Sequence, residues 1–176
     1  MDTPEFSIPS LNSPELYINR EQSLLEFNIR VLAQALDEHL PLLERLNYLC
    51  ISCSNLDEFY EVRVASLIQM GEMDSTAISV DGLSIQEQFE KISAKAHELV
   101  AEQNRVFNDV LIPSLESQNI RFLKRESWSE AQKIWLEKYF NEELLPILTP
   151  VGLDSAHPFP RILNKSLNFI ISLTGK

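Results

Sequence analysis

The residues best suited to chemistry in this 176-residue chain lie close together, between positions 50 and 67. They are one amide, Asn55, two adjacent carboxylates, Asp57 and Glu58, and one guanidinium, Arg63. The carboxylate oxygens are of the type that binds magnesium. Acids at this spacing also stabilise the positive N-terminal end of a helix. The helix-end role is the simpler one, so we expect no metal site here.

A helix is predicted to begin inside this stretch. Ser54 or Asn55 suits the N-cap position, where a side-chain oxygen accepts a backbone N–H that the first turn leaves unpaired. Ser54 followed by Asp57, and Asn55 followed by Glu58, both have the spacing of a capping box. We therefore expect Asp57 and Glu58 to serve the start of this helix.

Arg63 shares a helical stripe with apolar neighbours, so we expect it to be paired rather than bare. One interpretation is an ion pair with Glu21 or Glu26 on a facing helix. The other is a phosphate ligand, because the guanidinium fork suits both carboxylate and phosphate. The sequence favours the ion pair and leaves the phosphate role open.

The cysteines and histidines form no complete metal or catalytic set. Cys50 and Cys53 have the C-x-x-C spacing of redox and metal pairs, but the chain has only two cysteines. The preferred interpretation is two small core residues on one helix face. His39, His97 and His157 lie far apart and match no metal spacing. The prolines around His157 favour a fixed loop residue over a phosphoryl acceptor.

Composition narrows the possible partners. The hydrophobic fraction is 44% and the charged fraction 23%, as in a soluble globular protein. The net charge of -11 argues against nucleic acid and against tight binding of a polyanion by this chain alone. The four glycines form no phosphate-binding loop, and no apolar run could span a membrane. Free thiols and the lack of a signal peptide indicate the cytoplasm.

Helical periodicity dominates most of the chain after a proline-containing leader at residues 1–15, which is predicted to be flexible. We expect four helices, which run from Asn19 or Arg20 to about Glu38, from Pro41 to about Ser52, from the cap to about Met70, and from about Ser84 to Leu111. A loop at 71–82 precedes the last of these, and Pro113 should end or kink it.

The fourth predicted helix carries a heptad seam with one polar interruption, at Gln103. The seam is typical of the long arm of an antiparallel bundle, which is the preferred interpretation. An intermolecular coiled coil is the alternative.

The last third of the chain has a mixed pattern. A short strand is expected at 119–123, and Ser127 with Glu130 forms a capping box for a helix to about Leu145. The alternation of apolar side chains predicts a strand at Ser166–Thr174. Because a lone strand needs partners, the sequence is expected to be cut inside its second domain. The predicted fold is mainly α, an N-terminal antiparallel helical bundle at 16–115 followed by the truncated start of an α/β (α+β) head domain at 116–176.

Three motifs, in the same order, resemble the phosphohistidine type of bacterial polyphosphate kinase. They are Tyr17–Glu21 with Leu25–Asn28 and Arg30–Leu32, then Asn55–Phe59 with Val62 and Arg63, and finally Leu148–Pro150, Asp154 and His157–Pro160. Gln22 and Leu24 depart from the family pattern, which usually has an aliphatic residue and a Trp there. The resemblance runs from Tyr17 to the end but covers only the first part of a family member, which is several times longer.

The resemblance implies an enzyme that moves the terminal phosphoryl of ATP reversibly onto polyphosphate, through a phosphohistidine and with magnesium. The family's histidine and phosphate-gripping residues belong to C-terminal domains, so we expect no catalytic residue, no transferase activity and no tightly bound cofactor in this chain. The N-terminal domain covers the nucleotide base, and its motif asparagine, the ATP contact, maps onto Asn55. Arg63, Asp57 and Glu58 are candidate supporting residues.

A side-chain amide suits this role because it offers both a donor and an acceptor to an adenine edge. The partners implied for the complete enzyme are ATP or ADP and polyphosphate, and it is expected to be a homo-oligomer. The alternative is a free-standing helical interaction or dimerisation module without catalysis.

Overall fold

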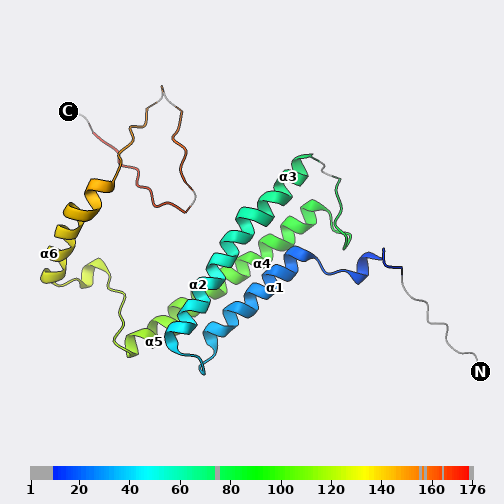
Figure 1. Ribbon diagram of the computed structural model, residues 1–176, viewed down its shortest axis with the longest axis horizontal. Helices are drawn as coiled ribbons and strands as arrows, with labels where there is room; N and C mark the ends of the chain where they lie inside the picture. Colours follow the sequence, from blue (N-terminus) through cyan, green and yellow to red (C-terminus); the bar gives the residue numbers. More distant parts are fainter. Residues whose placement is uncertain (1–9, 74–75, 155, 157, 164, 175–176) are drawn as a thin grey trace, which may run out of the picture. The chain divides into compact units, whose positions relative to one another are not determined.

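The computed structural model describes residues 10–73, 76–154, 156, 158–163 and 165–174. The chain divides into two compact units, one ending at Phe122 and the other beginning at Leu123. Both contain helices, and the described residues form no strand, only an isolated bridge between Ile78 and Ser84 (Figure 1). The mainly helical prediction is confirmed.

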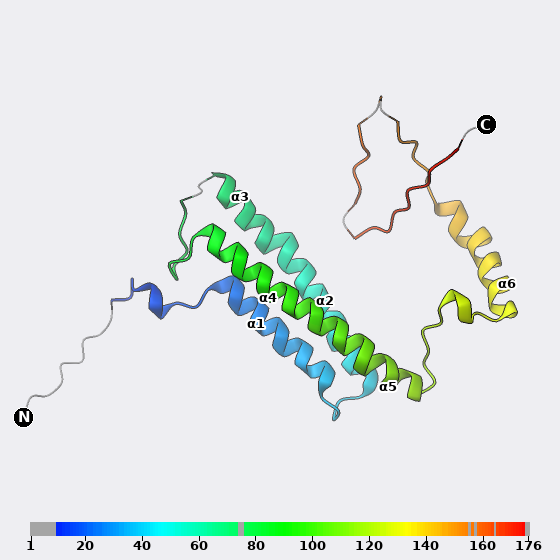
Figure 2. The ribbon, with the colours of Figure 1, turned by 180° about the vertical axis from the view of Figure 1, so that it is seen from behind.

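The first unit is an antiparallel arrangement of long helices. Its elements are α1 (Arg20–Ala33), α2 (Leu42–Glu58), α3 (Ala65–Met73), α4 (Ile85–Arg105) and α5 (Ile112–Ser117). Helices α1, α2 and α4 lie side by side in both views (Figures 1 and 2), and each contacts the other two. Their shared core includes Leu25, Leu32, Leu49, Leu56 and Leu99.

The start of α1 follows the sequence prediction. The Asn19 side chain caps the helix, because its Oδ1 accepts the backbone N–H groups of Glu21 and Gln22 at 3.1 and 3.0 Å. Its Nδ2 lies 3.4 Å from Oε1 of Gln88 on α4. The cap thus also ties α1 to the beginning of α4.

The predicted helix start at Ser54–Asn55 is wrong. Helix α2 continues without a break through both residues to Glu58, then passes through a π-helical segment, Phe59–Val64, into α3. Leu49, Leu56 and Phe59 form one buried stripe across the supposed boundary. Burial of such side chains stabilises by about 1.5–3 kcal/mol each. A cap contributes about 1 kcal/mol, so packing overrides the local signal.

The seam of α4 is buried within the chain's own bundle. Ile92, Ala96, Leu99 and Gln103 are all at most 7% exposed. The bundle interpretation therefore holds, and these positions are not free to build a coiled coil with a second chain.

Of the two effects expected of Pro113, an end or a kink, the end of the helix is not seen. A π-helical segment, Val106–Leu111, leads directly into α5, in which Pro113 is the second residue. Proline lacks the N–H that an α-helix would use here and its ring clashes with the preceding turn. The wider π turn just before it accommodates both defects.

The second unit contains α6 (Glu130–Tyr139), followed by a π-helical segment, Phe140–Leu144, and a 3-10 turn, Leu145–Ile147. Its capping box is formed by Ser129 and Gln132, two residues later than predicted, because the 3-10 turn Arg125–Ser127 occupies the earlier position. The helix itself was expected.

The predicted strands at 119–123 and 166–174 are not formed among the described residues. A strand requires backbone hydrogen bonds to a neighbouring strand, and no described segment pairs with either stretch. His157 and residues 1–9 of the predicted leader lie outside the described residues. Within the described part, no helix is long and apolar enough to cross a membrane.

Candidate functional site

A pocket of about 300 Å³ lies in the first unit, between α1 and the helix formed by α2 and its π-helical extension. Side chains from α1 and from the motif at 55–63 line it: Leu24, Leu25, Phe27, Asn28, Asn55, Glu58, Phe59, Val62 and Arg63. The structure thus brings together three of the four residues that the sequence singled out, Asn55, Glu58 and Arg63. The fourth, Asp57, does not line this pocket.

Asn55 is half-buried on α2 and hydrogen-bonded across to α1. Its Nδ2 donates to Oδ1 of Asn28 at 3.3 Å, and Nδ2 of Asn28 donates to the backbone carbonyl of Ser52 at 2.9 Å. Asn28 is only 3% exposed. Since Asn55 is no helix cap, its amide is available for a different role, at the wall of the pocket.

Sequence reasoning gave Asn28 no role of its own. The signal was an amide in the middle of a buried stripe, because Leu25 and Leu32 are the neighbouring buried positions of α1. A buried polar side chain is costly unless it is hydrogen-bonded. An amide at such a position therefore indicates specific hydrogen-bonding partners. Here they are the Ser52 carbonyl and the Asn55 side chain, both on α2.

The amide pair belongs to a buried polar chain that crosses the bundle. Ser52 is fully buried, and its hydroxyl accepts a hydrogen bond from Nε2 of Gln103 on α4 at 2.9 Å. Together with Asn28 this links α1, α2 and α4. Gln103, the one polar residue in the α4 seam, is thus hydrogen-bonded to α2, the helix that carries Asn55.

Arg63 is half-buried in the pocket wall and forms no ion pair with any described residue. The expected pair with Glu21 or Glu26 is therefore wrong, and Glu26 instead pairs with Lys95 of α4. A partly buried guanidinium without a carboxylate partner can receive an anion. The pocket thus combines an amide, a cation and apolar walls.

Cys50 and Cys53 are exposed on α2 and are not the core residues predicted. The buried stripe of this helix runs through Leu49, Ser52 and Leu56, so each cysteine lies one position beyond it and is rotated outward. Partial burial is the main cause that raises the pKa of the Cys53 thiol. A thiol with a raised pKa is a poor nucleophile and metal ligand.

The described residues contain no group of three or more His, Cys, Asp or Glu side chains that could hold a metal ion. Asp57 and Glu58 are successive residues of one helix, so their side chains point in directions about 100° apart. Asp57 and Glu58 therefore do not fit a magnesium site of their own.

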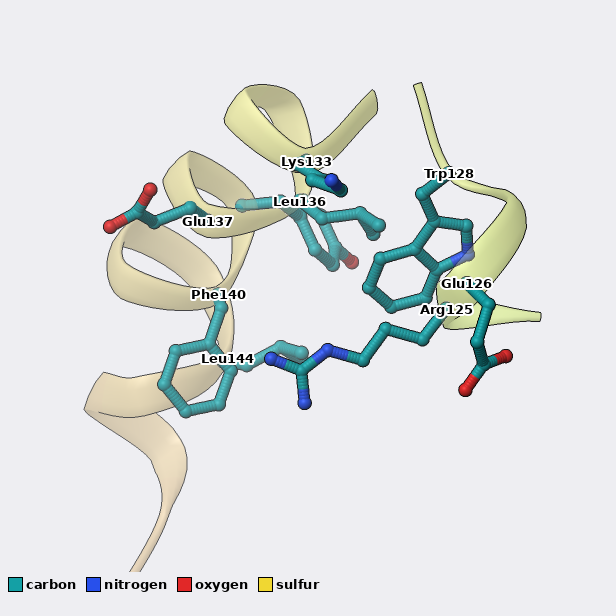
Figure 3. A pocket seen from close by; sticks show the side chains of 9 residues that line it. Arg125, Glu126, Trp128, Lys133, Leu136, Glu137, Phe140 and Leu144 are labelled. Atoms are coloured by element: carbon teal, nitrogen blue, oxygen red, sulfur yellow. The ribbon is translucent and has the colours of Figure 1, made fainter. Parts of the chain in front are cut away.

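The second unit has a larger but shallow concavity of about 1040 Å³ around Arg125, Trp128, Lys133 and Phe140 (Figure 3). Figure 3 shows the Arg125 side chain reaching across it toward Phe140 and Leu144. Most of its wall residues are exposed, so it is an open surface rather than an enclosed site. The smaller pocket is the stronger candidate, because separate motifs converge on it and a buried amide supports it.

Comparison with known proteins agrees with the motifs. The family profile described as "Polyphosphate kinase N-terminal domain" matches residues 17–123, and that of the "Polyphosphate kinase middle domain" matches residues 131–176. A polyphosphate kinase of Pseudomonas putida is 49% identical over 172 residues, which are 98% of this chain and 24% of the relative. One of Burkholderia multivorans is 50% identical over 159 residues, 90% of this chain and 23% of the relative.

A solved structure is also similar. The crystal structure of a polyphosphate kinase from Porphyromonas gingivalis matches 73% of this chain and 18% of its own, with 32% sequence identity and a TM-score of 0.55. This chain is therefore similar to the helical N-terminal domain of an enzyme. The chain belongs to the polyphosphate kinase family, and it spans about a quarter of the length of the curated relatives it matches.

Proposed function

We propose that this chain forms the nucleotide-covering N-terminal part of a polyphosphate kinase. The complete enzyme would transfer the terminal phosphoryl of ATP reversibly to polyphosphate through a phosphohistidine. The observation that carries the proposal is the convergence of Asn55 and Arg63, two residues of the family-like motif, on one pocket. Family membership supports the reaction, and the pocket supports the part that this chain plays in it.

Each wall of the pocket has a property that a nucleotide needs. Leu24, Phe27 and Val62 offer apolar surface against which a planar base can pack. Asn55 offers a donor and an acceptor to the polar edge of the base. Arg63 supplies a positive charge for the phosphates. Glu58 lies in the same wall, and its carboxylate would accept a hydrogen bond from a ribose hydroxyl or the base.

The transfer chemistry itself is assigned to the rest of the enzyme. No histidine lines this pocket, and the described acids do not fit the magnesium that the family uses. The net charge of -11 also opposes binding of polyphosphate by this chain alone. We therefore propose that the chain is inactive as a transferase, and that ATP or ADP and polyphosphate are partners of the complete, cytoplasmic and homo-oligomeric enzyme.

We further propose that residues 116–176 begin an α/β head domain of that enzyme. Leu167, Phe169, Ile171 and Leu173 alternate along the chain and are at least 77% exposed. Such an alternating apolar run is stable in water only when another strand or helix covers it. A free-standing interaction module has lost its main support, because the seam that suggested it is buried within the first unit.

The proposal can be tested by photolabelling the complete enzyme with 8-azido-ATP and identifying the labelled peptides by mass spectrometry. We expect ATP-protected labelling of a peptide within residues 55–63. In the same enzyme, Arg63→Gln should raise the KM for ATP, whereas Arg105→Gln removes a charge that is already paired with Glu102 on the surface and should not. Labelling confined to other parts of the enzyme, with an unchanged KM for Arg63→Gln, would overturn the proposal.

A further inference from the structure

The amide pair Asn28–Asn55 is a polar contact between α1 and α2, and both of its residues line the pocket. Asn28 comes from α1 and is 3% exposed, whereas Asn55 on α2 is half-buried. The contact therefore joins a side chain fixed inside the bundle to one that reaches the pocket.

The direction of the amides follows from a backbone carbonyl. The oxygen of Ser52 can only accept a hydrogen bond, so the atom of Asn28 that lies 2.9 Å away must be its nitrogen. The Oδ1 of Asn28 then faces Asn55, and it can only accept. The nitrogen of Asn55 must accordingly point to Asn28, at 3.3 Å.

This ordering decides what Asn55 has left to offer. One of its two N–H groups is used by Asn28, and its Oδ1 accepts no hydrogen bond from the described residues. The carbonyl oxygen and the second N–H are free for a ligand in the pocket. Without Asn28 the amide could turn over and exchange the positions of its donor and acceptor.

We propose that Asn28 is a positioning residue, which holds the amide of Asn55 in the single orientation in which it meets the nucleotide. This inference rests on the proposed function of the pocket. The bond to the Ser52 carbonyl ties α1 to α2 and uses only the nitrogen of the Asn28 amide, so its oxygen is left for the bond to Asn55. The second hydrogen bond of the Asn28 side chain, from Asn55, lies at the pocket wall.

The first test measures the orientation directly, in this chain and without a nucleotide. The side-chain amide signals of Asn55 are assigned by NMR as those lost in Asn55→Ala. In Asn28→Leu we expect them to move toward the shifts of the exposed Asn47 and to exchange faster with water. The control is Gln103→Leu, which removes another buried amide bonded to Ser52 but is hydrogen-bonded to neither Asn28 nor Asn55. It should leave the Asn55 signals in place.

The second test measures the consequence in the complete enzyme. Loss of one ligand hydrogen bond corresponds to a rise in the KM for ATP of about threefold to tenfold. We expect this rise in Asn28→Leu and in Asn55→Ala, with little change in kcat. The double variant should be no worse than Asn55→Ala alone, because the two residues act through one amide. Gln103→Leu should leave the KM unchanged.

The outcomes separate this inference from the function on which it rests. Unchanged Asn55 signals in Asn28→Leu overturn the positioning role, whatever the kinetics show. Additive effects on KM overturn it as well, since they would mean that Asn28 acts independently of Asn55. If Asn55→Ala leaves the KM for ATP unchanged, the proposed function of the pocket fails and the nucleotide role of the pair falls with it.

Discussion

Replacing Asn55 by alanine tests whether this residue serves ligand binding or the stability of the fold. A helix cap at this position would predict a loss of stability of about 0.5–2 kcal/mol. The structure places Asn55 inside the continuous helix α2, where it caps nothing. Its only side-chain hydrogen bond among the described residues is the 3.3 Å contact with Asn28.

The expected change in the free energy of unfolding is small because two effects oppose each other. Alanine is the better helix former in a helix interior by about 0.5 kcal/mol. Loss of the hydrogen bond removes about 0.5–1.5 kcal/mol. Truncation of Asn55 removes the side chain that covers the Asn28 oxygen in the pocket wall, so water can replace the missing donor. We expect a net loss of about 1 kcal/mol or less, from these two magnitudes.

The assay is urea unfolding of this chain, followed by far-UV circular dichroism, with Asn47→Ala as the matched control. Asn47 is exposed on the same helix, and its side chain has no hydrogen bond among the described residues. The control therefore measures the propensity gain alone, about 0.5 kcal/mol. The difference between the two variants is then the contribution of the Asn55 contact.

A loss of more than about 2 kcal/mol relative to Asn47→Ala would exceed the worth of one such hydrogen bond and would refute this reasoning. Asn55 would then hold the fold together. A near-neutral stability with a raised KM for ATP in the complete enzyme is the expected pair of results, and it would mean that Asn55 is kept for binding.

Two further predictions concern groups whose pKa the structure changes. Hydrogen bonds from the Ser84 hydroxyl and backbone N–H, at 2.7 and 2.8 Å, lower the pKa of Glu87 at the start of α4. A carboxyl whose pKa is lowered by folding stabilises the fold at pH values above its pKa in the unfolded chain. The advantage of wild type over Glu87→Gln in thermal melts should therefore shrink as the pH falls below the usual glutamate pKa of about 4.3. An advantage that grows in acid would contradict this prediction. Burial raises the pKa of Cys53, so alkylation of this thiol near neutral pH should be slower in the folded chain than in urea, and equal rates would show that the thiol is not shielded.

Much of the fold could be predicted from periodicity and local chemistry. The start of α1 at Asn19 or Arg20, the start of α4 near Ser84 and the helical face that contains Leu99 follow from local signals, and the structure has all three. The sequence also singled out Asn55 and Arg63, and the structure places both in the wall of one pocket. Their role in nucleotide binding stays a prediction.

Tertiary packing decided the rest, wherever local and global terms conflicted. No helix begins at Ser54 or Asn55, because the helix continues through them and buries Leu56 and Phe59. Burial of such side chains contributes more stability than a single capping hydrogen bond does. Cys50 and Cys53 face outward because the helical face that contains Leu49, Ser52 and Leu56 packs against the core.

The candidate site shows where a single sequence reaches its limit. The sequence by itself determined the helices and placed an amide and a cation on one of them. Only the tertiary structure decided that Asn28, 27 residues away from Asn55, holds its amide, and that Glu26 pairs with Lys95 and leaves Arg63 without a carboxylate. Such partners depend on which helices come into contact, and contacts between distant segments are set by the packing of the whole core.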